Sequence, residues 1–403
     1  MEVQIHDPQD PNIRAYKTRE QLIQTMKQRF SLHGYNQIRT STFEPYELYI
    51  NATGTIHTDE MIKMIDQDGK VLVLRPDITI PITRELAAQN FTAADHTRYF
   101  YVSDVFRNSF DGNGSKEKTQ AGIECFGEKS PEIDAEAIVL AIQTLKDLDV
   151  ANFKLEIGHA DFFKQVANEM NLDPQEFEQL EKYIQAKNMT EIGPFLEQHD
   201  VRPEVAEAAN AIPLLYGNPK SVIADAEKYA LNDTMKAALQ NLSEVYGVIE
   251  DYGLADYVVL DFGLINHMDY YSDIIFQGFI DNVAKPVLMG GRYDHLSEQF
   301  NARIPAIGFA FDVEALLEGT KESYEAPAAV DMTIIYEASR RQEAFFIAGE
   351  LRDQGLSTIV VPAKAVVKAN SQSIIQLTEN KQILLSGDEA KAFNNIDDLK
   401  EIL

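Results

Sequence analysis

Arg107, Gln120 and Glu124 are polar residues whose combined chemistry suits a small zwitterion. The guanidinium can hold a carboxylate, and the carboxylate can accept a hydrogen bond from an ammonium group or an imidazole N–H. The amide of Gln120 adds a neutral donor and acceptor between the two charges. The residue types therefore indicate a site for a small molecule with both charges. Taken alone, these three residues favour the alternative of a surface hairpin with ordinary ion pairs.

A β-hairpin would bring these three residues together. The alternating pattern of residues 99–106 predicts a strand, and the turn-rich stretch 108–114 predicts a loop. Residues 120–126 then predict the returning strand. Cys125 is a neighbour of Glu124 on this strand, so its side chain is expected on the opposite face, as a buried and inert thiol.

Size and composition indicate a globular protein. A chain of 403 residues can form two or three domains, and 45% hydrophobic and 25% charged residues are ordinary values for a globular protein. The N-terminal residues lack a basic segment followed by an apolar one, and no apolar run is long enough for a bilayer. We therefore expect a cytoplasmic protein without a membrane segment.

The charge balance argues against a nucleic-acid partner. Lys and Arg number 36 against 64 Asp and Glu, which gives a net charge of −28, whereas nucleic-acid binding needs a basic surface. The lone Cys125 excludes an internal disulfide and a cysteine-based metal site. The eight histidines are scattered without a close pair at ligand spacing. We expect neither a metal nor another cofactor.

Residue patterns also predict the domain organisation. Leu22, Met26 and Phe30 mark one face of a helix that begins near Thr18. Residues 161–252 are helical and acidic, which predicts a helical insertion within a domain of residues 1–320, whose last helix follows Pro305. Residues 318–329 have the composition of a linker. Residues 330–403 predict a small α/β domain in which a strand, a helix, a strand, a second helix and a strand follow one another.

Six segments of this chain occur in the same order in a known family. They are GYNQIRTSTFE (34–44), VLVLRPDIT (71–79), VFRN with TQAGIECFG (105–108 and 119–127), MDYYSDIIF (268–276), GGRYD (290–294) and PAIGFAFDVEALL (305–317). Over residues 15–320 the chain thereby resembles the histidyl-tRNA synthetase family, which has a class II aminoacyl-tRNA synthetase fold. The resemblance implies an α+β fold with an antiparallel sheet flanked by helices. It also implies a dimer formed through residues 34–44.

The chain departs from this family where the family binds ATP. Ser109 stands where the family has an acid that seats the adenine, Asn266 where it has an arginine at the α-phosphate, and Ala315 where it has an arginine over the adenine. Fixed donors and cations stabilise the charge that develops at phosphorus, and losing one donor typically costs about 10²–10³ in rate. The resemblance therefore implies that aminoacylation is lost and that this chain has no catalytic residues.

The amino-acid half of the family's site is kept. By resemblance, Asp77 and Thr79 would hold the α-ammonium of histidine together with Gln120, although Asp77 is one methylene shorter than the family's glutamate. Glu124 would bind the imidazole. Arg107 would face the carboxylate, and the aromatic residues that close around the imidazole would be Tyr270 and Tyr271. As alternatives, Asp77 and Thr79 could cap a helix and the tyrosines could simply pack in a strand.

This combination resembles a paralogous family, the regulatory subunits of ATP phosphoribosyltransferase in histidine biosynthesis. That resemblance implies a mixed assembly, a hetero-octamer with the short catalytic chain, which needs this subunit for activity and is inhibited by histidine. The C-terminal segment is acidic near its end, which is a poor surface for RNA. A divergent histidyl-tRNA synthetase that forms histidyl-adenylate is one rival hypothesis. A stand-alone amino-acid-binding or scaffold protein is the other.

One further motif has two interpretations. The backbone N–H groups of residues 290–294 could cradle a phosphate. The sequence favours instead a tight turn between strands, in which Arg292 pairs with a nearby carboxylate.

Overall fold

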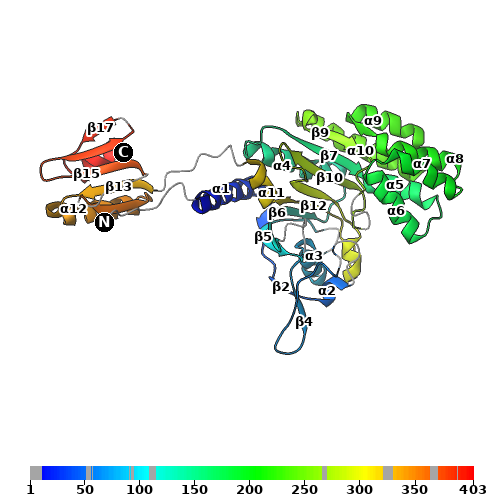
Figure 1. Ribbon diagram of the computed structural model, residues 1–403, viewed down its shortest axis with the longest axis horizontal. Helices are drawn as coiled ribbons and strands as arrows, with labels where there is room; N and C mark the ends of the chain where they lie inside the picture. The colour runs from blue at the N-terminus through cyan, green and yellow to red at the C-terminus, as the bar shows by residue number, and fades with distance from the viewer. Residues whose placement is uncertain are drawn as a thin grey trace. The chain divides into compact units, whose positions relative to one another are not determined.

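The computed structural model describes residues 11–50, 56, 58–89, 91, 95–108, 115–265, 270–320, 330–363, 371–387 and 389–403. The chain divides into two compact units (Figure 1). The larger unit comprises Leu22–Ser323, and the smaller one comprises Tyr324–Leu403 together with Met1–Gln21. Among the described residues, no helix combines the length and the apolar character that a membrane span requires.

A sheet of nine strands forms the centre of the larger unit. The strand order is β1-β5-β6-β12-β11-β10-β7-β9-β8. Neighbouring strands are antiparallel except for the parallel pairs β1 with β5 and β7 with β9. The strands are β1 (Asn36–Gln37), β5 (Thr97–Phe106), β6 (Glu117–Phe126), β7 (Phe153–His159), β8 (Tyr216–Gly217), β9 (Val258–Asp261), β10 (Ile274–Ile280), β11 (Leu288–Arg292) and β12 (Ala306–Asp312).

The predicted hairpin is confirmed as β5 and β6. The two strands pair in antiparallel register, with Tyr101 opposite Gly122 and Ser103 opposite Gln120. Because side chains alternate along a strand, Gln120, Gly122 and Glu124 share one face of β6. Cys125 lies on the other face, where it is buried in the main core as a free thiol.

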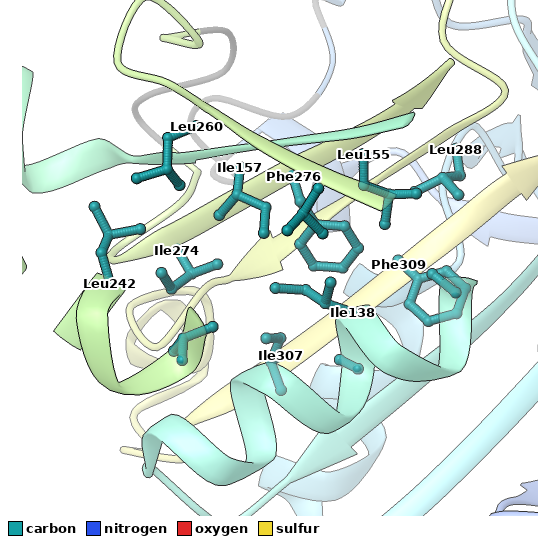
Figure 2. Close-up of a cluster of buried hydrophobic side chains, with 14 of the residues drawn as sticks. Ile138, Leu155, Ile157, Leu242, Leu260, Ile274, Phe276, Leu288, Ile307 and Phe309 are labelled. Carbon is teal, nitrogen blue, oxygen red and sulfur yellow. The ribbon is translucent and has the colours of Figure 1, made fainter. Parts of the chain in front are cut away.

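The main core lies between the large sheet and the helices packed on it. Helix α4 (Pro131–Asp147) contributes Ile138, and helix α10 (Asp233–Asp251), which packs on α4, contributes Leu242. Figure 2 shows Ile138 next to Phe276 and Phe309 of the sheet, and Leu242 next to Ile274. The first helix, α1 (Pro11–Leu32), buries the predicted face of Leu22, Met26 and Phe30 in the same core. It begins seven residues before Thr18, however, so the predicted start at Thr18 is wrong.

Residues 160–251 form mainly helices, as their pattern predicts. They are α5 (Ala160–Asn168), α6 (Pro174–Gln185), α7 (Met189–Gln198), α8 (Pro203–Ala211), α9 (Pro219–Ala226) and α10, with the short strand β8 between α8 and α9. Val166, Leu196 and Val205 from this region join the main core.

A smaller sheet and two helices pack beside the β5–β6 hairpin. The sheet has the order β2-β4-β3 and consists of β2 (Phe43–Pro45), β3 (Lys63–Ile65) and β4 (Val71–Leu74). Helix α2 (Glu47–Ile50) follows β2, and α3 (Thr79–Ala88) follows β4. Ile80, Ile82 and Leu86 of α3 enter a second core that Tyr101 and Val105 of β5 share. This packing fixes the start of α3 beside the hairpin.

The smaller unit has a five-stranded sheet of order β14-β13-β15-β16-β17. Its elements are β13 (Val330–Tyr336), α12 (Arg341–Asp353), β14 (Thr358–Pro362), β15 (Ser371–Leu377), β16 (Gln382–Ser386), β17 (Glu389–Ala392) and α13 (Ile396–Ile402). The second helix predicted for this unit is wrong for residues 371–377, which form a strand. Residues 364–370, which precede this strand, lie outside the described part of the chain. Likewise, the residues directly after Pro305 form β12, and α11 (Val313–Thr320) begins only after it.

Candidate functional site

A cavity of about 280 Å³ lies on the face of the large sheet that carries Gln120 and Glu124. All seven residues of the predicted binding set line it: Asp77, Thr79, Arg107, Gln120, Glu124, Tyr270 and Tyr271. Six further residues complete the wall: Tyr101, Met289, Tyr293, Gly308, Phe309 and Ala310. Segments as far apart in the sequence as Asp77 and Ala310 therefore form one wall. The hairpin, the start of α3, the end of β11 and the middle of β12 each contribute to it.

Two glycines leave room for the side chains that fill this face. Gly308 lies opposite Glu124 in the β6–β12 register, and a Cβ atom there would lie 2.0 Å from the Glu124 Oε2. A Cβ atom on Gly291 would lie 2.7 Å from the Tyr271 ring. Such distances are too short for any real Cβ atom, so glycine is required at both positions.

Glu124 is the most buried acid of the cavity and is held by two hydroxyl groups. The Thr79 hydroxyl donates to Oε1 at 2.6 Å, and the Tyr293 hydroxyl donates to Oε2. Only 2% of Glu124 is exposed, and this burial raises the pKa of its carboxyl to about 8, although both hydroxyl donors favour the ionised form. Near neutral pH, Glu124 can therefore either hold a proton or pass one to a bound base.

Asp77 faces the cavity and also caps the start of α3. Its Oδ1 accepts the backbone N–H of Ile80 at 2.7 Å. Burial raises the pKa of Asp77, whereas this hydrogen bond and the nearby Arg107 act in the opposite direction. The capping alternative is thus correct for one oxygen of Asp77. Thr79, by contrast, directs its hydroxyl to Glu124.

Arg107 is oriented by a backbone carbonyl that lies just before α3. Its Nε donates to the carbonyl oxygen of Pro76 at 3.1 Å. The carbonyl of Arg75 accepts from the backbone N–H of Phe106, so the segment before Asp77 is tied to the end of β5. Arg75 itself is buried and donates to the carbonyls of Thr40 and Asp104. These bonds fix the guanidinium of Arg107 near Asp77.

Three tyrosines form the aromatic side of the cavity. Tyr270 stacks on Tyr293 with ring centroids 5.3 Å apart, and it meets Tyr271 edge-on at 4.9 Å. Tyr270 and Tyr271 are neighbours in the sequence, and Tyr293, which was not predicted as a site residue, adds a third ring by stacking on Tyr270. Its signal was the GGRYD motif, which the sequence analysis assigned to a turn. In the structure, Gly290, Gly291 and Arg292 belong to strand β11.

A buried ionic network fixes Arg292, the residue that precedes Tyr293. Arg292 is fully buried and donates to Asp134 from Nε at 2.8 Å and from Nη2 at 2.6 Å. It also donates to Asp294 at 3.1 Å and to the carbonyl of Glu128 at 3.1 Å. The predicted pairing of Arg292 with a carboxylate is thus confirmed. Because Tyr293 follows Arg292 directly, this network orients the hydroxyl that reaches Glu124.

Of the three positions where the sequence departs from the synthetase pattern, the structure describes one. Ala315 is fully buried in the main core, and its backbone N–H donates to Asp312 at 2.9 Å. The Asp312 carboxylate also accepts from Lys118 at 3.1 Å. Ser109 and Asn266 lie outside the described residues. Position 315 therefore contributes a core methyl group and no cation.

Comparisons with known proteins agree on one group. The family described as Histidyl-tRNA synthetase matches residues 8–316. A protein of Oceanobacillus iheyensis named ATP phosphoribosyltransferase regulatory subunit is 41% identical, over 93% of this chain and 92% of its own length. A protein of the same name from Acetivibrio thermocellus is 38% identical, over 82% of this chain and 80% of its own length.

Solved structures with the same fold carry related names. A Bacillus halodurans protein, titled an ATP phosphoribosyltransferase regulatory subunit/histidyl-tRNA synthetase, has a TM-score of 0.79 and 27% identity, covering 90% of this chain and 95% of its own. A histidyl-tRNA synthetase from a Nostoc species has a TM-score of 0.80 at 15% identity, covering 96% of each chain, and this similarity concerns the fold alone.

Proposed function

This chain belongs to the family of ATP phosphoribosyltransferase regulatory subunits, and we propose that it binds free histidine in the cavity around Glu124. It has no transferase activity of its own, as a regulatory subunit. Its partner is a short catalytic ATP phosphoribosyltransferase chain, and this catalytic chain depends on the regulatory subunit for activity. Histidine in the cavity inhibits the assembly, so that the end product of the pathway limits its first step.

The observation that carries this proposal is the charge pattern of one cavity. Arg107 supplies a cation, whereas Asp77 and Glu124 supply carboxylates, and all three line the same 280 Å³ space. Histidine has the complementary set: a carboxylate, an ammonium group and an imidazole. Arg107 pairs with the carboxylate, Asp77 with the ammonium, and Glu124 accepts the imidazole N–H. The rings of Tyr270, Tyr271 and Tyr293 close around the imidazole.

Exposed apolar side chains support the dimer that the family resemblance implies through residues 34–44. Phe43 on β2 is 50% exposed, and Ile65 on β3 is 75% exposed. Ile50 and Met64, in the adjoining α2 and β3, are exposed as well. Apolar groups gathered in one region are typical of protein interfaces. Two such dimers together with four catalytic chains would give the expected hetero-octamer.

Calorimetric titration of the purified chain with histidine tests the binding site. We expect one histidine per chain. Glu124→Gln removes a charged hydrogen bond that is worth about 1.5–3 kcal/mol, so the affinity should fall about 10- to 150-fold. Glu244→Gln, on the exposed surface of α10, is the matched control and should bind as the unaltered chain does. Unchanged histidine affinity in Glu124→Gln would refute the assignment of the cavity.

Reconstitution with a short catalytic chain tests the regulatory role. We expect phosphoribosyl transfer to require both chains and histidine to inhibit it. The assembly with Glu124→Gln should remain active but need at least about tenfold more histidine for inhibition. Titration with ATP tests the synthetase alternative, since an adenylate-forming enzyme must bind ATP tightly with histidine. Formation of histidyl-adenylate by this chain alone would overturn the proposed function.

A further inference from the structure

Helix α12 of the smaller unit exposes an apolar face. Ala344, Ile347, Ala348 and Leu351 face the five-stranded sheet and are buried there, and α12 lies along that sheet (Figure 1). Phe346, on the other side of the helix, is 59% exposed. Phe345, at the flank of the helix, is 54% exposed although its ring also meets Tyr336 of β13 edge-on. Phenylalanine loses favourable free energy for every part of its ring that stays in water. Two adjacent exposed phenylalanines therefore indicate a surface that is covered in the functional assembly.

A glycine lies in the middle of the same face. With 3.6 residues per turn, Gly349 follows Phe345 by four residues and Phe346 by three, so all three share one side of α12. Within a helix, glycine costs about 1 kcal/mol relative to alanine. The fold of this unit does not require it, because a Cβ atom at position 349 would meet nothing within 4 Å. Because Gly349 has no side chain, it leaves open space beside the two rings, where a side chain from another molecule has room.

The charges at the two ends of this face are opposite. Arg341 is exposed at the start of α12, and Asp353 is exposed at its end. By contrast, the neighbouring Arg340 pairs with Glu343, and Glu350 pairs with Lys400. The face thus has a cation at one end, an acid at the other and an apolar centre.

We propose that this face binds the same face of a second copy of the chain, as an antiparallel pair of α12 helices. With a two-fold axis at the level of Ile347, Phe345 of each copy comes opposite Gly349 of the other. In the same arrangement, Arg341 of each copy comes opposite Asp353 of the other. One surface is then its own complement in shape and in charge, as a two-fold symmetric interface requires. This interface is separate from the one proposed around Phe43 and Ile65, so it would join two dimers into a tetramer.

Sedimentation velocity of the full chain over a wide concentration range tests the proposal. We expect the unaltered chain to show a reversible step that doubles its mass. Gly349→Leu fills the open space beside the rings, so this step should weaken at least about tenfold, which is the effect of losing about 1.4 kcal/mol. Because the site is open, Gly349→Leu should fold normally, with an unchanged or higher unfolding temperature. Gly247→Leu, at an equally open glycine within α10, is the matched control and should leave association unchanged.

Exchanging the charges of Arg341 and Asp353 gives a test that does not depend on added side-chain volume. Arg341→Asp and Asp353→Arg should each weaken the mass-doubling step, because each places like charges opposite one another. The double variant should restore it, since both pairs are then reversed. A role of either residue within one chain would not give this recovery, as the two lie at opposite ends of α12.

Two outcomes would overturn the proposal. In one, all of the variants and the unaltered chain show the same mass at every concentration. In the other, Gly349→Leu leaves self-association unchanged but weakens binding of the catalytic chain, which would identify a helix of that partner as the occupant. Neither outcome depends on histidine binding, so the proposed function and this inference can fail separately.

Discussion

At the scale of single residues, the proton of Glu124 determines how the cavity responds to pH. Thr79 and Tyr293 donate to this carboxyl, and Asp77 and Tyr101 lie close by. With its pKa raised to about 8, Glu124 is largely protonated at pH 7, whereas a free imidazole, with a pKa of about 6.5, is largely neutral. A Glu124–imidazole pair holds one proton in total, so binding near pH 7 requires almost no proton from solvent.

We therefore predict that histidine affinity is nearly level between about pH 6.5 and pH 8. Above pH 8, Glu124 is ionised and the imidazole is neutral, so binding must take up one proton and the affinity falls up to about tenfold per pH unit. Calorimetry at pH 7 and pH 8.5, in buffers with different ionisation enthalpies, measures the number of protons taken up. If Glu124 instead titrated near its ordinary pKa of about 4.3, affinity would already fall above pH 6.5.

Gly308 allows a second prediction at this scale. Its replacement by alanine leaves every charge of the cavity in place but puts a Cβ atom 2.0 Å from the Glu124 Oε2. The carboxylate must then move away from Thr79 and Tyr293. We expect Gly308→Ala to lower histidine affinity about 5- to 150-fold, because overpacking costs typically about 1–3 kcal/mol. Gly193→Ala, at an open position of α7, should bind histidine normally.

The residues of the cavity differ in how far the sequence could identify them. Arg107, Gln120 and Glu124 could be identified because one hairpin brings them together within 18 residues. Asp77 and the two adjacent tyrosines were found only through the resemblance to a family. Tyr293 was missed because its role depends on the stacking of Tyr270 and on the position of β11 beside β12, which are long-range contacts. The GGRYD motif marks the position of Tyr293, but no local pattern shows which residues it contacts.

At the scale of elements, Arg292 joins α4 to the end of β11. Burial raises the pKa of Asp134 to about 6 even though Arg292 lies beside it, so this acid depends on its partner to remain charged at neutral pH. Arg292→Met would leave Asp134 buried and unpaired, which we expect to lower the free energy of unfolding by about 3–5 kcal/mol. Urea denaturation measures this loss.

A second variant distinguishes a lost charge pair from lost packing. Replacing both partners, as Arg292→Met with Asp134→Leu, removes the unpaired charge and should recover most of the stability. Equal stability of the two variants would contradict this account. Because Tyr293 follows Arg292 directly, histidine affinity should fall in Arg292→Met and recover less completely than stability does.

The elements that the sequence predicted well are those with a strong local pattern. The β5–β6 hairpin and the helices between 160 and 251 follow from alternation and from helical spacing. The segment after Pro305 was predicted to be a helix, but AIGFAFD is a short apolar run, and periodicity alone does not distinguish a buried helix from a buried strand in such a run. Its strand β12 pairs on both sides, with β6 and β11. Strand β15 was missed for a similar reason, because its pairing with β13 and β16 is not visible in the local sequence.

At the scale of the whole molecule, the two proposals fall in different units. Every residue that lines the cavity around Glu124 belongs to Leu22–Ser323, whereas α12 belongs to the unit that contains Tyr324–Leu403. The net charge of −28 favours repulsion between copies. An interface between two copies must therefore offset this repulsion locally, as the Arg341–Asp353 pairs on α12 would do. Added salt should screen the repulsion between whole chains and also weaken these pairs.

We finally predict that histidine binding and α12 pairing can be removed independently. Phe346→Arg should weaken the mass-doubling step at least about tenfold, yet it should keep histidine affinity within about twofold of the unaltered chain. Glu124→Gln should show the reverse pattern, with weak histidine binding and normal self-association. Calorimetry and sedimentation on the same preparations measure both properties. If histidine itself shifts the mass-doubling step, Phe346→Arg must also change histidine affinity by the same factor, because coupling between two sites is reciprocal. If histidine instead leaves the mass-doubling step unchanged, and each variant alters only its own property, then histidine inhibition of the assembly must use a route that does not pass through α12.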